Sequence, residues 1–553
     1  MLRRLDPWLL AILGVSLVLC LAHLGWGLPN GNDSWAADAM GPLTVLNVGR
    51  RQLFGWETGW FWFKYPFGYP LMLLLAYAPY LALVWLTGGL GRPAAEYPYG
   101  LSDPEGVVHV LALIGRGVNV AFVVGTVAAT YAIGRELLGQ RSGRLAAWFT
   151  ATAYPLVYYA HTTNQDAAYL FWLTLALWGT VAGTFARHPR PLWVMGFAAG
   201  MAMATKEQGF AFLLGLPIVL VIAGYRRGDP ARGRFARLWR AAWNPGTRGG
   251  AAIAIATWLV AGNAIFNPRG FLNRLSDLSG NPVPGISARI TPVEFSLFKG
   301  FPKEWAYVTD FVDVVASTFG TPLFVVSLAG LVYLALRRPH VALCLIVPFA
   351  AYYLLSLRTH HVLTLRYTLP VVPIFAVAGA AVCVAALRHR FPGALLVVSL
   401  LAVLGLGRAV ELVALLRDDP RYAAEAWMEQ HLPAKASVEI YQKPVYLPRL
   451  PRHDVHEVPL EERSIAGIEE RQPLAIVLSS ASRKTITHFW TKDWREGDGS
   501  LLTEIPAASE MLRALEGGGL PYREVARFER EPWLLRLRIT SVAPTIRVFR
   551  RAP

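Results

Sequence analysis

The stretch that decides the fold class is residues 107–134, VVHVLALIGRGVNVAFVVGTVAATYAIG, an apolar run in which Arg116 is the one formally charged residue. A helix needs about 20 apolar residues to cross a bilayer, and this run is longer. Comparable apolar runs lie near residues 8–28, 69–89, 145–162, 167–186, 191–204, 210–225, 249–266, 312–336, 340–356, 369–387 and 393–415. Since 54% of the 553 residues are hydrophobic and 16% are charged, we expect an α-helical polytopic membrane protein.

The connections between these runs differ in charge, and the difference indicates the topology. The basic connections are GRELLGQRSGR (134–144), ARHPR (186–190), RRGDPARGRFARLWR (226–240), LRRP (336–339) and LRHR (387–390). Basic loops tend to stay in the cytoplasm, and the MLRRL start carries the same signal. We therefore attribute the net charge of +16 to topology and expect no nucleic-acid partner.

One apolar run before residue 107 must not cross the membrane if the N-terminus and the basic loops are to lie on the same side. The best candidate is 69–89, YPLMLLLAYAPYLALVWLTGG, because Pro79 interrupts it and Pro66 and Pro70 lie near its start. We expect it to form a juxtamembrane or re-entrant helix that returns to the outside, which leaves about 11 spans. The N-terminus is then cytoplasmic, and the protein lies in the plasma or inner membrane. The external segments are about 29–106, 163–166, 205–209, 267–311, 357–368 and the tail.

The tail after residue 415 changes composition and is expected to be a soluble α/β domain outside the membrane. Its strand-like runs are LAIVLSS (474–480) and LLRLRIT (534–540), and AASEMLRALEGGG (507–519) resembles a helix that ends in glycines. We find no catalytic motif in it. The domains predicted are thus a membrane domain, 1–415, and an extracytoplasmic domain, 416–553. The three cysteines lie within apolar runs, so disulfides and cysteine metal sites are not expected.

Polar residues gather at the predicted outer ends of several spans. They are Asp33, Lys64, Arg116, His161, Asn164, Asp166, Lys206 and Arg366. A charge near the bilayer centre costs roughly 2.5–3.5 kcal/mol on insertion scales and usually marks a cavity or a pathway. The shared side of these residues therefore suggests a site at the outer face.

Five of these residues also have a plainer explanation, whereas Arg116 is harder to dismiss because it lies inside an apolar run. Asp33, in LPNGNDSWAADAM (28–40), could cap a helix. Lys64 could anchor at the interface by snorkelling, and Arg366 could contact headgroups. Asp166 could cap the following span, and Lys206 could be an ordinary turn lysine. Two acids and four bases on one face are less easily explained as coincidence.

Transfer of a sugar from a lipid phosphate would use such a set. The leaving phosphate is a weak base that needs positive charge, which lysine and arginine supply. The acceptor hydroxyl needs one carboxylate as general base. The two facing carboxylates of glycosidases are not required.

At these positions the chain resembles the GT-C superfamily of membrane glycosyltransferases, closest to the protein O-mannosyltransferases and lipid A aminoarabinose transferases (glycosyltransferase families 39 and 83). The resemblance covers about residues 8–415. The segments that carry it are GNDSWAADAM (31–40), KYPFGYP (64–70), Arg116 at the start of its span, YYAHTTNQDAAYLFW (158–172), GFAAGMAMATKEQGF (196–210) and RYTLPVVPIF (366–375). It implies the GT-C fold, with juxtamembrane helices in the first external loop, in agreement with the treatment of 69–89.

The resemblance also implies a reaction and roles for these residues. The donor would be a polyprenyl- or dolichyl-phosphate sugar in the bilayer, and the acceptor an extracytoplasmic protein, lipid or glycan, attacked with inversion. Asp33 would be the general base, and Asp166 would orient the acceptor or pair with a base. The donor-phosphate ligands would be Lys64, Arg116, Lys206 and Arg366, and the substrate-lining residues Trp35, His161 and Asn164.

The chain departs from the family pattern at two positions. Ser34 stands where the mannosyltransferases usually have a second acid, and Phe63 stands where the aminoarabinose transferases have an acid before the lysine. We therefore expect no metal and no cofactor, and the sugar and the acceptor stay open.

The alternative function is a transporter or flippase for a lipid-linked substrate, which would also place charges at membrane depth. Transporters commonly show internal repeats and discontinuous helices at the midplane. We find no repeated half, and the polar set lies at one predicted face. A non-catalytic assembly protein is a third possibility, but it would not need acids and bases in this order.

Overall fold

The computed structural model describes residues 6–28, 35–36, 39–55, 66–92, 94, 98–185, 188–228, 233–278, 301–359, 363–490 and 502–552. The chain forms two compact units. The membrane unit comprises Met1–Leu24 and Met40–Leu412, and the C-terminal unit comprises Gly25–Ala39 and Val413–Pro553. The predicted boundary at 415 lies close to this division. Residues 25–39, which we expected in the membrane domain, group instead with the C-terminal unit.

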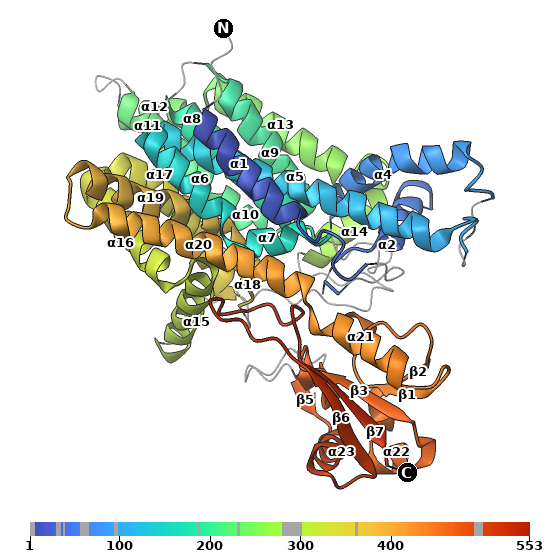
Figure 1. Ribbon diagram of the computed structural model, residues 1–553. Coiled ribbons are helices and arrows are strands. Elements are labelled where there is room, and N and C mark those ends of the chain that lie inside the picture. The colour runs from blue at the N-terminus through green and yellow to red at the C-terminus, as the bar shows by residue number, and fades with distance from the viewer. Residues whose placement is uncertain are drawn as a thin grey trace. The chain divides into compact units, whose positions relative to one another are not determined.

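The membrane unit is built of helices, as expected from its apolar runs (Figure 1). They are α1 (Pro7–Leu21), α2 (Pro42–Gly49), the π-helical turn η1 (Arg50–Phe54), α4 (Gly68–Leu86), α5 (Pro104–Leu138), α6 (Gln140–Ala151), α7 (Tyr154–Ala160), α8 (Asp166–Phe185), α9 (Arg190–Thr205), α10 (Gly209–Leu213), α11 (Gly215–Arg227), α12 (Arg234–Ala242), α13 (Pro245–Ala261), α14 (Pro268–Leu278), α15 (Phe301–Phe319), α16 (Thr321–Arg337), α17 (Pro339–Leu355), α18 (Leu365–Thr368) and α19 (Val372–Arg388). The helix α20 (Ala394–Arg417) leads into the C-terminal unit.

By length and composition, six helices of the described residues are able to cross a membrane, or up to seven if a bent pair counts as one span. The chain is therefore a multi-pass membrane protein. Shorter apolar helices such as α1 and α17 fall outside that criterion, so the number 11 stays a prediction. The helix α4 is among the six and continues through Pro79. The proline does not interrupt it, and its re-entrant course also stays a prediction.

The apolar run 312–336 does not form one straight span as expected. Two helices, α15 and α16, meet there at 113°. Gly320 lies between them with φ of 81°, a left-handed conformation that favours glycine. Pro322 is the second residue of α16, in the first turn, where its missing N–H costs no helical hydrogen bond. The hydropathy of the run does not reveal this break, because glycine and proline are both tolerated in apolar segments.

Small residues bring α9 close to its neighbours. A Cβ atom at Gly196 would lie 2.0 Å from the carbonyl oxygen of Gly250 on α13, and one at Gly200 would lie 2.5 Å from that of Ala254. Glycines four residues apart allow two helix backbones to approach in this way. The contact fixes α9, and Lys206 directly follows its last residue.

The C-terminal unit contains a five-stranded sheet in the order β2-β1-β3-β7-β6. The strands are β1 (Ser437–Ile440), β2 (Asp454–Glu457), β3 (Ala475–Ser479), β6 (Tyr522–Phe528) and β7 (Ile546–Arg551), and β4 (His488–Trp490) pairs separately with β5 (Leu502–Glu504). The strands β2, β1 and β3 run parallel, whereas β7 is antiparallel to β3 and to β6. The helices are α21 (Pro420–His431), α22 (Ile465–Arg471) and α23 (Pro506–Gly517).

Side chains on the two faces of β3 pack into two different hydrophobic clusters. Ile476 and Leu478 pack with Met511 of α23, while Ala475 and Val477 pack in the cluster that contains Met428 of α21. The expected α/β fold and the strand at 474–480 are thus confirmed. The expected strand at 534–540 is wrong, because the segment forms no strand and β7 occupies the place beside β3. Alternation of apolar and polar residues shows that a segment could form a strand. It does not show whether that segment finds a partner strand in the sheet.

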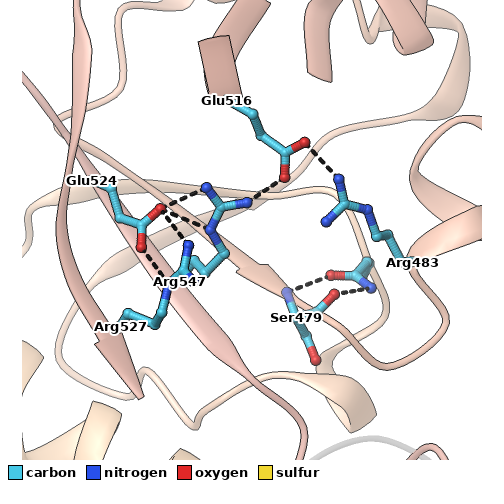
Figure 2. Close-up of polar contacts among 7 residues, drawn as sticks. Ser479, Arg483, Glu516, Glu524, Arg527 and Arg547 are labelled. Atoms are coloured by element: carbon cyan, nitrogen blue, oxygen red, sulfur yellow. Dashed lines mark hydrogen bonds and ion pairs between the residues drawn. The ribbon is translucent and has the colours of Figure 1, made fainter. Parts of the chain in front are cut away.

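An alternating chain of ion pairs lies at one end of this sheet (Figure 2). Arg547 of β7 contacts Glu516 and also Glu524. Arg483 contacts Glu516, and Arg527 contacts Glu524. The set links α23 to β6 and β7.

Candidate active site

The centre of the candidate site is a buried ion pair between Asp166 and Lys206. Asp166 is the first residue of α8 and is 1% exposed, and the Lys206 Nζ donates to its Oδ1 at 2.7 Å. Lys206 follows α9 with extended backbone. The backbone N–H of Asp166 donates to the Asn164 Oδ1 at 2.9 Å. Asn164, predicted to line substrate, therefore also fixes the start of α8.

Aromatic rings flank the Lys206 ammonium group. Its Nζ lies 5.6 Å from the centre of the Tyr169 ring and 5.1 Å from that of Tyr367. Both distances are within the range of cation–π attraction. Arg366 also contacts Tyr367, with its Cζ 5.1 Å from the ring centre and its Nη2 3.2 Å from the hydroxyl. The segment with Arg366 thus meets the one with Lys206 at the ring of Tyr367.

Asn119 holds the loop between α7 and α8. This fully buried residue of α5 donates through Nδ2 to the carbonyl oxygens of Thr162 and Asn164, each at 2.8 Å. Its Oδ1 accepts from the Tyr69 hydroxyl of α4 at 3.1 Å. The sequence analysis missed Asn119. A polar residue three positions after Arg116 in an apolar helix lies on the same face, and this was the available signal.

Arg116 and His161 bind the chain just after α1. The Arg116 Nη1 donates to the carbonyl oxygen of Leu24, and the His161 Nε2 lies 2.7 Å from that of Ala22. Arg116 is 1% exposed and His161 is fully buried. Both residues therefore fix the chain at the start of the predicted first external loop.

The far end of that loop is tied to the same region. Met40 donates its N–H to the carbonyl oxygen of Thr163 at 3.2 Å, and the Thr163 hydroxyl donates to the carbonyl oxygen of Met40 at 2.8 Å. Thr163 lies three residues before Asp166. Both flanks of residues 25–39 are thus held by residues from α5 and from the loop that precedes α8.

Three predicted site residues are not among the described side chains of the membrane unit. Asp33 and Lys64 lie outside the described residues, so their roles stay predictions. Trp35 is described in the C-terminal unit and is 0% exposed. Its ring packs against Tyr422, with 4.7 Å between the ring centres. Contact with a substrate would require this side chain to become exposed.

A second ion pair near Lys206 was not anticipated. Arg274 of α14 holds Glu207 with two nitrogens, of which Nη2 lies 2.8 Å from Oε2. Glu207 is the neighbour of Lys206, and Arg274 is 8% exposed. Among the residues that the structure describes, no cluster of three histidine, cysteine or acidic side chains is positioned to hold a metal ion.

Residues 110–236 match a family model described as dolichyl-phosphate-mannose-protein mannosyltransferase. This part contains Arg116, His161, Asn164, Asp166 and Lys206. No curated protein matches the chain.

Several solved structures are similar at low identity. The Archaeoglobus fulgidus oligosaccharyltransferase in complex with Zn and sulfate has a TM-score of 0.46 and 12% identity, over 98% of this chain and 88% of that one. ArnT from Cupriavidus metallidurans bound to undecaprenyl phosphate has a TM-score of 0.43 and 14% identity, over 98% of each chain. The family match covers less than a quarter of the chain, and within residues 110–236 it agrees with the resemblance to the protein O-mannosyltransferases found in the sequence.

Proposed function

We propose that the protein transfers a sugar from a polyprenyl- or dolichyl-phosphate-linked donor to an extracytoplasmic protein, lipid or glycan. The observation that carries the proposal is the buried Asp166–Lys206 pair beside Arg366 and Tyr367, within the helices that begin or end at the predicted outer face. The matched family's description names a dolichyl-phosphate sugar, which supports the donor class. We place the N-terminus in the cytoplasm and the C-terminal unit outside, because the basic loops indicate it.

In the proposed reaction the acceptor hydroxyl oxygen attacks the anomeric carbon from the face opposite the phosphate. The bond between the anomeric carbon and the phosphate oxygen breaks, and the lipid phosphate leaves with the bonding electrons. Asp33 takes the hydroxyl proton as general base. The configuration at the anomeric carbon is inverted.

Cationic side chains stabilise the leaving phosphate in this proposal. Lys64, Arg116 and Arg366 supply positive charge. Lys206 is already paired with Asp166, but an ammonium group has three N–H donors and Asp166 uses one. The others remain able to bind a phosphate oxygen. In this proposal Asp166 holds Lys206 in place through the hydrogen bond between them.

The test is transfer by the purified protein in proteoliposomes, supplied with radiolabelled polyprenyl-phosphate sugar and extracted membrane acceptors. We expect a labelled product, free polyprenyl phosphate in equal amount, inverted configuration and no loss of activity with EDTA. Movement of the intact donor across the bilayer without any transfer would contradict the proposal and favour the transporter. Loss of activity with EDTA, restored by a divalent cation, would contradict the expected absence of a metal.

A further inference from the structure

The segment that carries Asp33 belongs to the C-terminal unit, although about 370 residues separate them in the chain. Trp26 and Trp35 are 1% and 0% exposed in this unit. Their ring centres lie 6.4 Å apart in an edge-to-face arrangement. Two large side chains from this short segment are therefore buried, and they contact Asp419 and Tyr422 of the C-terminal unit.

The Trp35 ring lies between two arginines of this unit. The Cζ of Arg421 lies 4.2 Å from its ring centre, and the Cζ of Arg449 lies 5.1 Å away. Cation–π attraction is strongest where the cation is removed from water, and indole is the ring that binds cations best. The contact is specific to an aromatic ring, because an aliphatic side chain of similar size offers no negative face.

Hydrogen bonds fix both guanidinium groups. Arg421 is fully buried; its Nε and Nη2 lie 2.9 and 2.8 Å from the two carboxylate oxygens of Asp419, and its Nη2 also donates to the carbonyl oxygen of Ser541 at 2.7 Å. Arg449 pairs with Glu425 through Nε at 2.8 Å and Nη2 at 2.6 Å. These hydrogen bonds raise the pKa of Arg449, so its charge persists. The binding place for Trp35 is therefore rigid.

The same groups also bind the chain before Asp33. The Trp26 Nε1 donates to the Asp419 Oδ2 at 3.1 Å, and the Gly27 N–H donates to the Tyr422 hydroxyl at 2.9 Å. The Nη1 of Arg449 donates to the carbonyl oxygen of Leu28 at 3.1 Å. Arg449 thus contacts both Leu28 and Trp35, the described residues on either side of Asp33.

We propose that the C-terminal unit positions the loop of the general base, with Trp35, Arg421 and Arg449 as positioning residues. The proposal rests on the proposed function, in which Asp33 accepts the proton. A general base must lie within about 3 Å of the hydroxyl that it deprotonates. A displacement of about 1 Å can reduce the rate about 100-fold. The contacts at Trp26, Leu28 and Trp35 hold the described residues on either side of Asp33, and in this proposal they restrict the position of Asp33.

The experiment uses the full chain in proteoliposomes with Trp35→Leu, Trp35→Phe and Arg421→Lys. Trp35→Leu removes the aromatic face, whereas Trp35→Phe retains one. Arg421→Lys retains the charge but not the two-nitrogen contact with Asp419. The matched control is Arg547→Lys, which changes an arginine with two acidic partners in the same unit that does not contact Trp35 (Figure 2).

We expect Trp35→Leu and Arg421→Lys to lower kcat by at least about tenfold and to change KM for the lipid donor less than about twofold. Hydrogen exchange should rise in residues 25–39 but not in β3. Trp35→Phe should recover most of kcat, and Arg547→Lys should behave as wild type. The KM and the β3 exchange distinguish displacement of the loop from unfolding of the unit.

The positioning proposal is overturned if both Trp35→Leu and Arg421→Lys release residues 25–39 in hydrogen exchange but keep the wild-type kcat. It is also overturned if β3 loses protection together with the loop in both variants. Asp33→Asn in the same assay separates this failure from failure of the proposed function. If Asp33→Asn is fully active, the proposed base is wrong whatever the Trp35 variants do.

Discussion

Asp166 and Lys206 form a pair whose two members depend on each other, since both are almost completely buried. Removal of one partner from a buried pair typically costs about 3–5 kcal/mol, because the other charge stays unpaired. We therefore expect Asp166→Asn and Lys206→Met each to lower the melting temperature clearly. The double variant should recover much of the stability but remain inactive in transfer.

Thermal unfolding of the four proteins in nanodiscs gives the coupling energy between the two residues. A strictly additive double variant would show that the ion pair does not stabilise the fold. Full activity of the double variant would show that Asp166 and Lys206 are not part of the active site.

Asn119 is the second residue that we expect to be sensitive. Asn119→Leu preserves the approximate volume but leaves the carbonyl oxygens of Thr162 and Asn164 without this donor. The expected cost is about 1–3 kcal/mol for each buried group left unsatisfied. Hydrogen exchange of residues 159–166 should increase, and kcat should fall.

The matched control for Asn119 is Thr130→Val on the same helix. Thr130 is equally buried, but its hydroxyl bonds to the carbonyl oxygen of Thr126 in its own helix. We expect Thr130→Val to have wild-type activity and wild-type hydrogen exchange in residues 159–166. Equal effects of the two variants would mean that Asn119 has no specific role in holding the loop.

At the scale of elements, the ion-pair chain beside β6 and β7 predicts a pH dependence (Figure 2). The hydrogen bond from Arg527, together with those from Arg547, lowers the pKa of Glu524 below its usual value of 4.5. Because the folded pKa is the lower one, the stabilisation is complete above pH 4.5 and is lost as the pH falls through the folded pKa. Protection of the β6 amides, corrected for intrinsic exchange, should decrease below pH 4.5, and Glu524→Gln should weaken the dependence. An equally steep dependence in Glu524→Gln would assign it to other groups.

The course of α4 is a second prediction for an element. The helix is continuous and apolar enough to cross a membrane, yet the charge of the later loops requires that one early run does not cross. A topology reporter fused near residue 98 should therefore report an extracytoplasmic position. A cytoplasmic position would make α4 a full span and reverse the predicted orientation of every later segment. A second reporter in the basic loop before α12 serves as the cytoplasmic control.

Sequence patterns predicted the elements best where a run of apolar residues determines whether a segment is a helix or a strand. The apolar run at 107–134 predicted α5, and LAIVLSS predicted β3. The break at Gly320 was missed because hydropathy does not report backbone conformation. The segment 534–540 was predicted as a strand because alternation does not reveal which run finds a partner.

At the scale of the whole molecule, Asp166, Lys206 and Arg366 lie near one another in the membrane unit, whereas the sequence did not indicate what holds Trp26, Leu28 and Trp35. Outer ends of spans converge by topology, so Asp166, Lys206 and Arg366 were expected together. The contact between Trp26 and Asp419 joins residues 393 positions apart, and that between Leu28 and Arg449 joins residues 421 positions apart. Nothing in the local composition of residues 25–39 indicates that they bind a distant α/β domain.

The central claim is that Asp33 is the general base of a sugar transfer from a lipid phosphate. The most direct measurement is the single-turnover rate of transfer by Asp33→Asn from a purified polyprenyl-phosphate sugar, beside Asp38→Asn from the same loop as the control. We predict a rate lowered roughly 100- to 10,000-fold for Asp33→Asn, with donor binding intact and with Asp38→Asn close to wild type. Transfer by folded Asp33→Asn at the wild-type rate would contradict the account.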